Sequence, residues 1–275
     1  MIDGKLSLIL PAHNEEPNIE AVVRQAADVL PTLFTDYEVL VVDDGSKDRT
    51  GEIADELAAE NPHVKALHHP KNRGYGGALT TGFTNATGDY LMFMDSDRQF
   101  DIQDLENLTP YIGSYDIVAG YRIKRNDPYY RFLIGSGFNQ MVKLLFQVNL
   151  RDIDCGFKVF KAEVLQGMNL ESPGALINTE IHAKANVQGR SLVEVGVNHY
   201  PRLEGEQSGA SIKVMFRAVQ ETFRLWGRMR GYVPPDGNIV VAPASARGMV
   251  TFGAVLLAGF AMFVFLLTRI ARRRD

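Results

Sequence analysis

Short apolar runs alternate with amphipathic helical patterns along the first half of the chain. The apolar runs have the length of β-strands and cover residues 6–12, 37–44, 64–69, 89–95 and 116–122. Residues 18–30 and 50–61, which lie between the first three runs, repeat apolar side chains at helical spacing. This alternation predicts an α/β fold with a mostly parallel sheet flanked by helices, in which ligands bind at the carboxyl ends of the strands.

A polar or glycine-rich segment follows each of the first four predicted strands. These segments read PAHNEE at residues 11–16, DDGSKDRT at 43–50, HPKNRGYGGA at 69–78 and DSDRQFD at 95–101. A single segment of this kind is an ordinary polar turn. Four of them at the carboxyl ends of parallel strands would share one rim, so together they favour a binding site.

The run YLMFMDSDRQFD at residues 90–101 ends an apolar strand in a cluster of acids. Carboxylates at such a strand end must be solvated, paired or bound to a cation. Asp95 and Asp97 are two residues apart, and a turn can direct both at one point with Gln99 nearby. A small number of hard oxygen ligands suits Mg²⁺ or Mn²⁺, which also bind substrate phosphates. A nucleotide diphosphate is therefore the expected bridge.

Charge and cysteine content exclude several classes of function. A net charge of −4 gives no general attraction for nucleic acid, so an anionic partner needs a local basic patch. The single cysteine, Cys155, excludes an internal disulfide and a cysteine-built zinc site. We expect His68 and His69 to be surface residues, and Lys158 and Lys161 to be solvated charges.

The C-terminal part contains a basic amphipathic pattern at residues 211–230. Apolar side chains share one helical face there, and lysines and arginines line the strip beside it. Such a helix is either a domain helix with a solvated basic face or one that lies on anionic lipid headgroups. We favour the second interpretation because an apolar segment follows closely. Residues 129–148 are mostly apolar but interrupted, which predicts an interfacial or core helix.

Residues 248–268 contain no charged side chain. As a helix they would cross the roughly 30 Å hydrocarbon core of a bilayer, so we predict one transmembrane helix rather than a buried core helix. Arginines flank it on both sides, so they do not decide its orientation. We expect a single-pass membrane protein with a cytoplasmic catalytic domain. The predicted organisation is a catalytic domain (1–210), an interfacial helix (211–231), a linker (232–247), the membrane helix (248–268) and a basic tail (269–275).

Several motifs in order resemble the family 2 glycosyltransferases of the GT-A fold, in the branch of dolichol-phosphate mannose synthases and polyprenyl-phosphate glycosyltransferases. The motifs are PAHNEE, VVDDGSKDRT at 41–50, NRGYGGAL at 72–79, DSDRQF at 95–100, DCGFKVFKAEVL at 154–165, TEIHAKA at 179–185 and EVGVNHYPRLEGEQS at 194–208. The resemblance extends from about residue 6 to about residue 213. It implies a GT-A nucleotide-sugar-binding fold.

The resemblance also implies a donor site. His13 stands where the family commonly has a tyrosine. Gly74, Gly76 and Gly77 would let backbone approach the nucleotide. The metal would be held by Asp95, Asp97 and Gln99. The residues that would border the nucleotide or read its base or ribose are Pro11, Ala12, His13, Glu15, Asp43 and Asp44.

On the acceptor side, the resemblance implies that Arg122 and Arg131 contact a lipid phosphate and that Arg202 and Lys213 close over the diphosphate or the acceptor. A phosphate acceptor is already anionic near neutral pH, so the enzyme needs to position it and needs no general base. A sugar hydroxyl acceptor would require a base. Glu180 is the best candidate for that role, although it can equally be a paired structural acid.

The expected function is metal-dependent, inverting transfer of a hexosyl group to a polyprenyl or dolichyl phosphate. The donor would be GDP-mannose or UDP-glucose, with mannosyl transfer favoured, and the cofactor Mg²⁺ or Mn²⁺. A lipid acceptor explains the predicted membrane anchor, and no nucleic-acid partner is expected. Two alternatives stay open: a GT-A transferase that acts on a saccharide or lipid hydroxyl, and a catalytically silent nucleotide-sugar-binding membrane protein.

Overall fold

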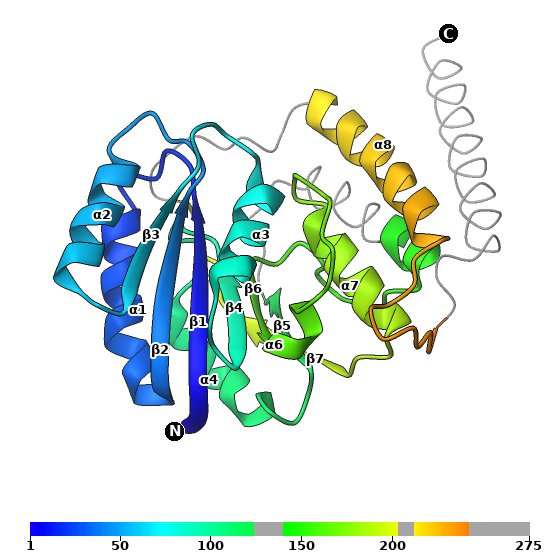
Figure 1. Ribbon diagram of the computed structural model, residues 1–275, viewed down its shortest axis with the longest axis horizontal. Coiled ribbons are helices and arrows are strands. Elements are labelled where there is room, and N and C mark those ends of the chain that lie inside the picture. Colours follow the sequence, from blue (N-terminus) through cyan, green and yellow to red (C-terminus); the bar gives the residue numbers. More distant parts are fainter. Residues whose placement is uncertain (124–139, 203–211, 242–275) are drawn as a thin grey trace, which may run out of the picture.

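A sheet with helices on both faces forms the body of the protein (Figure 1). The computed structural model describes residues 1–123, 140–202 and 212–241, with the backbone alone for 212–219. Its strands are β1 (Ile2–Ala12), β2 (Phe34–Asp43), β3 (Val64–His68), β4 (Tyr90–Met94), β5 (Ile117–Arg122), β6 (Phe157–Lys161) and β7 (Leu192–Val197). Its helices are α1 (Ile19–Leu33), α2 (Thr50–Glu60), α3 (Tyr75–Asn85), α4 (Leu105–Leu108), α6 (Ala162–Leu165), α7 (Ile177–Val187) and α8 (Ile212–Met229).

The strand order within the described residues is β3-β2-β1-β4-β6-β5-β7. All neighbouring pairs are parallel except the two made by β6, which runs antiparallel to β4 and β5. The predicted mostly parallel α/β sheet is therefore confirmed. The chain winds from β1 outward to β3 and then returns to place β4 on the other side of β1. This reversal is the point at which open α/β sheets bind ligands.

Alternate side chains of the strands enter two separate cores, because successive residues of a strand point to opposite faces. On one face, Ile9 and Phe93 belong to a cluster that includes residues of α3, α7 and α8. On the other face, Leu8 and Met92 pack with residues of α1, α2 and α4. The helical stretch at residues 140–146 joins the first cluster through Leu145, so the described end of the predicted 129–148 segment is a core helix.

The apolar side of α8 lies inside the protein in its described half. Leu225, Trp226 and Met229 are 1%, 7% and 2% exposed and belong to the same core as α7, which lies beside α8 (Figure 1). These side chains therefore contact protein rather than lipid, which differs from our favoured interpretation. The side of α8 that stays open carries Arg224 and Arg228. The helix ends at Met229, close to the predicted end of the interfacial helix at residue 231.

The predicted transmembrane helix at residues 248–268 lies outside the described residues. Among the helices that the structure describes, none has the length and apolarity needed to cross a bilayer.

A buried carboxylate of β2 links β1, β2 and β3 on the side away from the carboxyl ends of these strands. Glu38 of β2 is 2% exposed and accepts hydrogen bonds from Ser7 Oγ (2.6 Å), Lys65 Nζ (2.7 Å) and Thr87 N (2.7 Å). Burial alone would raise the pKa of Glu38, but the hydrogen bonds from Lys65, Ser7 and Thr87 lower it to about 2. The carboxylate is thus ionised and stabilises the fold at neutral pH.

We expect Glu38→Gln to lower the free energy of unfolding by about 2 kcal/mol at neutral pH, since hydrogen bonds to charged groups contribute roughly 1.5–3 kcal/mol each. The folded-state pKa of about 2 lies below the ordinary value of 4.5, so this contribution is present above pH 4.5 and is lost as the pH falls toward 2. Urea denaturation should show the difference between wild type and variant shrinking below pH 4.5. Glu52→Gln, at a surface position, is the control and should change little. A difference that stays constant with pH would contradict the prediction.

Candidate active site

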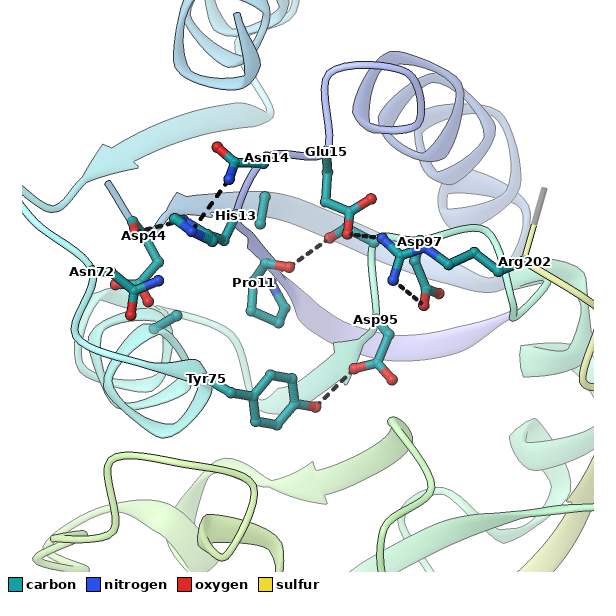
Figure 2. A pocket seen from close by; sticks show the side chains of 13 residues that line it. Pro11, His13, Asn14, Glu15, Asp44, Asn72, Tyr75, Asp95, Asp97 and Arg202 are labelled. Carbon is teal, nitrogen blue, oxygen red and sulfur yellow. Dashed lines mark hydrogen bonds and ion pairs between the residues drawn. The ribbon is translucent and has the colours of Figure 1, made fainter. Parts of the chain in front are cut away.

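A cleft with a volume of about 730 Å³ opens at the carboxyl ends of β1, β2 and β4 (Figure 2). Its volume is typical of pockets that bind small molecules. All four loops predicted to share a rim contribute to it. The lining residues are Pro11, Ala12, His13, Asn14, Glu15, Asp44, Asn72, Tyr75, Ala78, Asp95, Ser96, Asp97 and Arg202.

The two acids after β4 both reach this cleft. The Asp95 backbone N–H donates to the Gly156 carbonyl at 3.1 Å, and a Cβ at Gly156 would lie 2.2 Å from the Asp95 carboxylate. Asp97 accepts a hydrogen bond from Gln99 N at 3.1 Å. Arg98, which lies between Asp97 and Gln99, has a φ of 61°, a conformation that is uncommon for a residue with a side chain. This tight turn keeps both carboxylates on the pocket wall, as the spacing predicted.

Gln99, the third predicted metal ligand, is not among the pocket-lining residues. Its side-chain Nε2 donates to the backbone carbonyl of Tyr200 at 3.1 Å. The backbone carbonyl of Gln99 accepts from Tyr200 N at 2.9 Å. Gln99 therefore joins the loop after β4 to the segment that precedes Arg202.

Arg202 brings positive charge to the acidic side of the cleft. Its Nη2 lies 2.6 Å from Glu15 Oε1, and its Nη1 lies 3.6 Å from Asp97 Oδ2 (Figure 2). The three side chains are 12–15% exposed. Arg202 therefore stands beside the acids, where the resemblance placed a cation over the diphosphate. Its predicted partner Lys213 has no described side chain, and Arg131 lies outside the described residues.

Tyr75 is a pocket residue that the sequence reasoning missed. Its hydroxyl donates to Asp95 Oδ1 at 2.8 Å (Figure 2). Burial, followed by the charge of Asp95, raises the pKa of Tyr75 well above its ordinary value, so the phenol keeps its proton and donates. The available signal was its position between Gly74 and Gly76 in the loop that follows β3. Asn14, Asn72, Ala78 and Ser96 also line the cleft and were not predicted.

Asp44 lines the pocket and also supports its loops. Its carboxylate accepts from Arg73 N and Gly74 N, each at 2.8 Å, and lies 2.6 Å from His69 Nδ1. The expectation that His69 is a surface residue is wrong, because it is 7% exposed and its other ring nitrogen lies 2.8 Å from Thr81 Oγ1. Asp44 thus fixes the turn that leads into α3.

Asp43 does not line the cleft. It accepts from Ser46 N at 3.0 Å and lies 3.2 Å from His68 Nδ1. His68 keeps 40% of its side chain exposed, as expected for a surface residue, and also lies 3.0 Å from Asp55. Burial alone would lower the pKa of His68, but these two carboxylates raise it. In this structure Asp43 therefore supports the loop after β2.

The glycines of the third loop contact another part of the chain. Gly76 N and Gly77 N donate to the Pro173 carbonyl at 2.8 and 3.4 Å. A Cβ at Gly76 would lie 2.0 Å from the Ser172 carbonyl, and one at Gly74 would lie 2.4 Å from the Pro173 carbonyl. The close approach seen here is thus to residues 172–174, and the approach to a nucleotide stays a prediction.

Arg122 is not among the residues that line the cleft. Its Nε and Nη2 form a bidentate ion pair with Asp152 at 2.6 and 2.7 Å. Burial alone would lower the pKa of Arg122, but the Asp152 carboxylate raises it. The guanidinium already has its matching carboxylate, so this geometry does not support the prediction that Arg122 contacts an acceptor phosphate.

Lys158 is fully buried, which corrects the expectation of a solvated charge. Its ammonium donates to the carbonyls of Ile153 (3.0 Å) and Cys155, and lies 5.5 Å from the centre of the Phe93 ring. Lys161 is partly exposed and lies 3.2 Å from Asp116. Burial raises the pKa of the Cys155 thiol to about 12, which disfavours the thiolate that a nucleophile needs.

Glu180 is buried and does not line the cleft. Its carboxylate accepts from Ser172 N at 2.8 Å and from Glu171 N at 3.1 Å, and it lies 2.7 Å from Lys184 Nζ. Burial alone would raise the pKa of Glu180, but Lys184 and Ser172 lower it. The role of general base is therefore not supported, and the paired structural acid is what the structure contains.

The sequence was compared with models of known families. Residues 7–168, more than half of the chain, match the model described as glycosyl transferase family 2. The chain belongs to this family. The match includes all four loops that form the cleft, so every residue that lines the cleft except Arg202 lies within the matched region.

Two curated relatives support membership of the glycosyltransferase family. The chain is 34% identical over 230 residues to a dolichol-phosphate mannosyltransferase of Pyrococcus furiosus, covering 80% of this chain and 63% of the relative. It is 31% identical over 235 residues to glycosyltransferase AglD of Haloferax volcanii, covering 82% of this chain and 37% of the relative. The chain thus spans less than two thirds of either relative. Its membership of this family agrees with the predicted resemblance.

Solved structures share the fold at low sequence identity. Glucosyl-3-phosphoglycerate synthase from Mycobacterium tuberculosis, in complex with Mn²⁺, UDP and phosphoglyceric acid, gives a TM-score of 0.65 at 17% identity and covers 81% of this chain and 78% of its own. Mannosyltransferase PcManGT from Pyrobaculum calidifontis, in complex with GDP-Man and Mn²⁺, gives a TM-score of 0.59 at 19% identity. The likeness covers 86% of this chain and 67% of the mannosyltransferase. These likenesses confirm the predicted GT-A architecture of the sheet and helices.

The acids of this cleft suit a divalent cation. Burial, followed by the charge of Asp97, raises the pKa of Asp95, a repulsion that a cation between the two would relieve. Tyr75 occupies one oxygen of Asp95 and leaves the other for a ligand. Within the described residues, no group of three or more His, Cys, Asp or Glu could hold a metal. Two carboxylates fit an ion that shares its other ligands with phosphate and water.

Proposed function

We propose that this glycosyltransferase moves a hexosyl group, mannose or glucose, from a nucleotide sugar to a polyprenyl phosphate, with inversion and with Mg²⁺ or Mn²⁺ as cofactor. The observation that carries the proposal is the pairing of Asp95 and Asp97 with Arg202 in one cleft at the carboxyl ends of β1 and β4. The names of the relatives and neighbours agree with it. One is a dolichol-phosphate mannosyltransferase, and others have solved structures in complex with Mn²⁺ and either UDP-glucose or GDP-Man.

The residues of the cleft have complementary roles in this reaction. Asp95 and Asp97 would hold the cation, with Asp95 oriented by Tyr75. A bound divalent cation supplies electrostatic stabilisation to the departing diphosphate. Arg202 adds a second positive charge on the same side. Leaving-group charge is thus neutralised without a protein acid that donates a proton.

The surroundings of Glu180 favour an acceptor that is already anionic. Its carboxylate, the base considered for a hydroxyl acceptor, is buried and held by two backbone N–H groups and Lys184. A phosphate acceptor needs no such base. The uncharged segment at residues 248–268 supports a lipid acceptor as well, and we propose it as a single membrane anchor with the catalytic domain on the cytoplasmic side.

The experiment is a transfer assay on membranes that contain the full chain. Labelled GDP-mannose and UDP-glucose are supplied with Mn²⁺ and a polyprenyl phosphate. Label in the organic phase that depends on both additions is the expected result, and the enzyme should stay in the membrane fraction after an alkaline carbonate wash. Label transferred only to a water-soluble saccharide would favour the hydroxyl alternative. Donor binding with no transfer to any acceptor would favour the silent alternative.

A further inference from the structure

Glu180 is a buried acid outside the cleft whose contacts all lie within residues 171–184. It lies in the first turn of α7 and is fully buried. Its two oxygens accept three contacts from Glu171 N and Ser172 N, while Lys184 lies one helical turn further along and provides the counter-charge. An ionised carboxylate buried with this many donors fixes the atoms around it strongly. Here the fixed atoms are the backbone of residues 171–172.

The same short segment is held from two other directions. Lys184 Nζ also donates to the carbonyl of Asn169 and contacts Glu180. Lys184 therefore binds the start of residues 169–172, and Glu180 binds their end. From α8, Arg228 Nη1 lies 2.7 Å from Glu171 Oε2. We call residues 169–174 the clamp loop. Its shape is set by charged groups of α7 and α8.

The clamp loop ends on the first turn of α3. Its Pro173 carbonyl accepts from Gly76 N and Gly77 N, two of the N–H groups that a helix leaves unsatisfied at its start. Gly76 has no space for a side chain, because a Cβ there would lie 2.0 Å from the Ser172 carbonyl. The clamp loop and the start of α3 therefore move together.

The start of α3 carries the tyrosine that holds the metal-site acid. Tyr75 stands directly before Gly76, and its hydroxyl donates to Asp95 Oδ1 at 2.8 Å. A displacement of the helix start would lengthen this hydrogen bond and leave Asp95 free to rotate. Outer contacts of this kind set the orientation of metal ligands and their affinity.

We propose that Glu180 is a positioning residue of the donor site, which holds the clamp loop against α3 so that Tyr75 keeps Asp95 turned into the cleft. The inference rests on the proposed function, because it assigns Glu180 to the same nucleotide and metal site. It excludes the base role, in which Glu180 would act on the acceptor and leave donor binding unchanged.

The test is Glu180→Gln in the full chain. The glutamine keeps the size of the side chain, but it turns an N–H₂ toward the backbone donors or Lys184. We expect the affinity for Mn²⁺ with UDP or GDP to fall about tenfold or more, the range for outer contacts of a metal site. Turnover at saturating donor and metal should change much less. Glu163→Gln, the same substitution at an exposed helix position, should change neither.

A second variant keeps the test decisive if Glu180→Gln folds poorly. Tyr75→Phe removes only the last hydrogen bond of the series, so it should lower Mn²⁺ affinity in the same way without a comparable loss of melting temperature. The double variant should lose less Mn²⁺ affinity than the product of the two separate fold-changes, because both substitutions act through Asp95.

The outcomes separate this inference from the proposed function. If wild type binds neither UDP nor GDP in the presence of Mn²⁺, the proposed function fails. If wild type binds a nucleotide and both variants bind it equally well, the positioning role alone fails. A Glu180→Gln variant with unchanged affinity and abolished turnover would make Glu180 a base and overturn the inference.

Discussion

Replacing Asp97 with asparagine should lower the turnover of sugar transfer about a thousandfold, because a divalent cation contributes several kcal/mol of transition-state stabilisation and 1.36 kcal/mol is tenfold in rate. Asp97 lines the cleft beside Asp95 and faces Arg202. The amide keeps the shape of the side chain and can still accept from Gln99 N. What it removes is the negative charge that a cation needs.

The measurement has a binding part and a catalytic part. Titration with Mn²⁺ in the presence of UDP or GDP should show at least about a tenfold weaker apparent affinity, the lower end of what even outer-shell changes cost. The transfer assay on membranes then reports turnover. Asp28→Asn, which removes the charge of an exposed residue of α1, is the matched control and should leave both unchanged. Normal Mn²⁺ affinity in Asp97→Asn would show that this acid is not a metal ligand.

The rim of the site could be predicted because its signals are local. Each of the first four predicted strands is followed directly in sequence by its polar loop, and parallel strands place such loops together. Glu15, Asp44, Asp95 and Asp97 accordingly meet in one cleft. The first five predicted strands appear as β1 to β5, because their apolar runs fill a sheet that is covered on both faces.

The sequence reasoning was weakest for charged side chains whose partners carry no local sequence signal. Arg122 pairs with Asp152, and nothing in the sequence around either residue indicates the other. Lys158 is the second residue of β6, where it is opposite Phe93 of β4, and its partners are backbone carbonyls that carry no sequence signal. Glu180 likewise binds backbone N–H groups. Burial of a charge is decided by tertiary packing, which a linear pattern does not contain.

Tyr75 was missed for a related reason. The predicted motif drew attention to the glycines on both sides of it, while its own role depends on where α3 begins and on where β4 ends. Only the assembled sheet brings its hydroxyl to Asp95. The amphipathic pattern of α8 shows the opposite limit: the pattern is real, but periodicity alone does not say whether protein or lipid covers the apolar side.

Arg202→Ala should separate the role of positive charge from that of metal binding. We expect turnover to fall about a hundredfold, the lower range for loss of one group that stabilises developing negative charge. Mn²⁺ affinity should not fall, because removal of a cation 3.6 Å from Asp97 relieves competition for that carboxylate and for Glu15. The signature is therefore the reverse of the one expected for Asp97→Asn, which weakens metal binding first.

The same two assays measure it, with Arg24→Ala as the control, since Arg24 is an exposed arginine paired with Glu20 and Glu60 on the surface. Arg202→Lys is informative as well. A lysine keeps the charge but lacks the planar fork that contacts Glu15 and Asp97 together, so its turnover should lie between wild type and alanine. A drop in Mn²⁺ affinity equal to that of Asp97→Asn would instead mean that Arg202 shapes the metal site. The role expected for Arg202, to neutralise charge on the leaving diphosphate, begins only after the cation has bound.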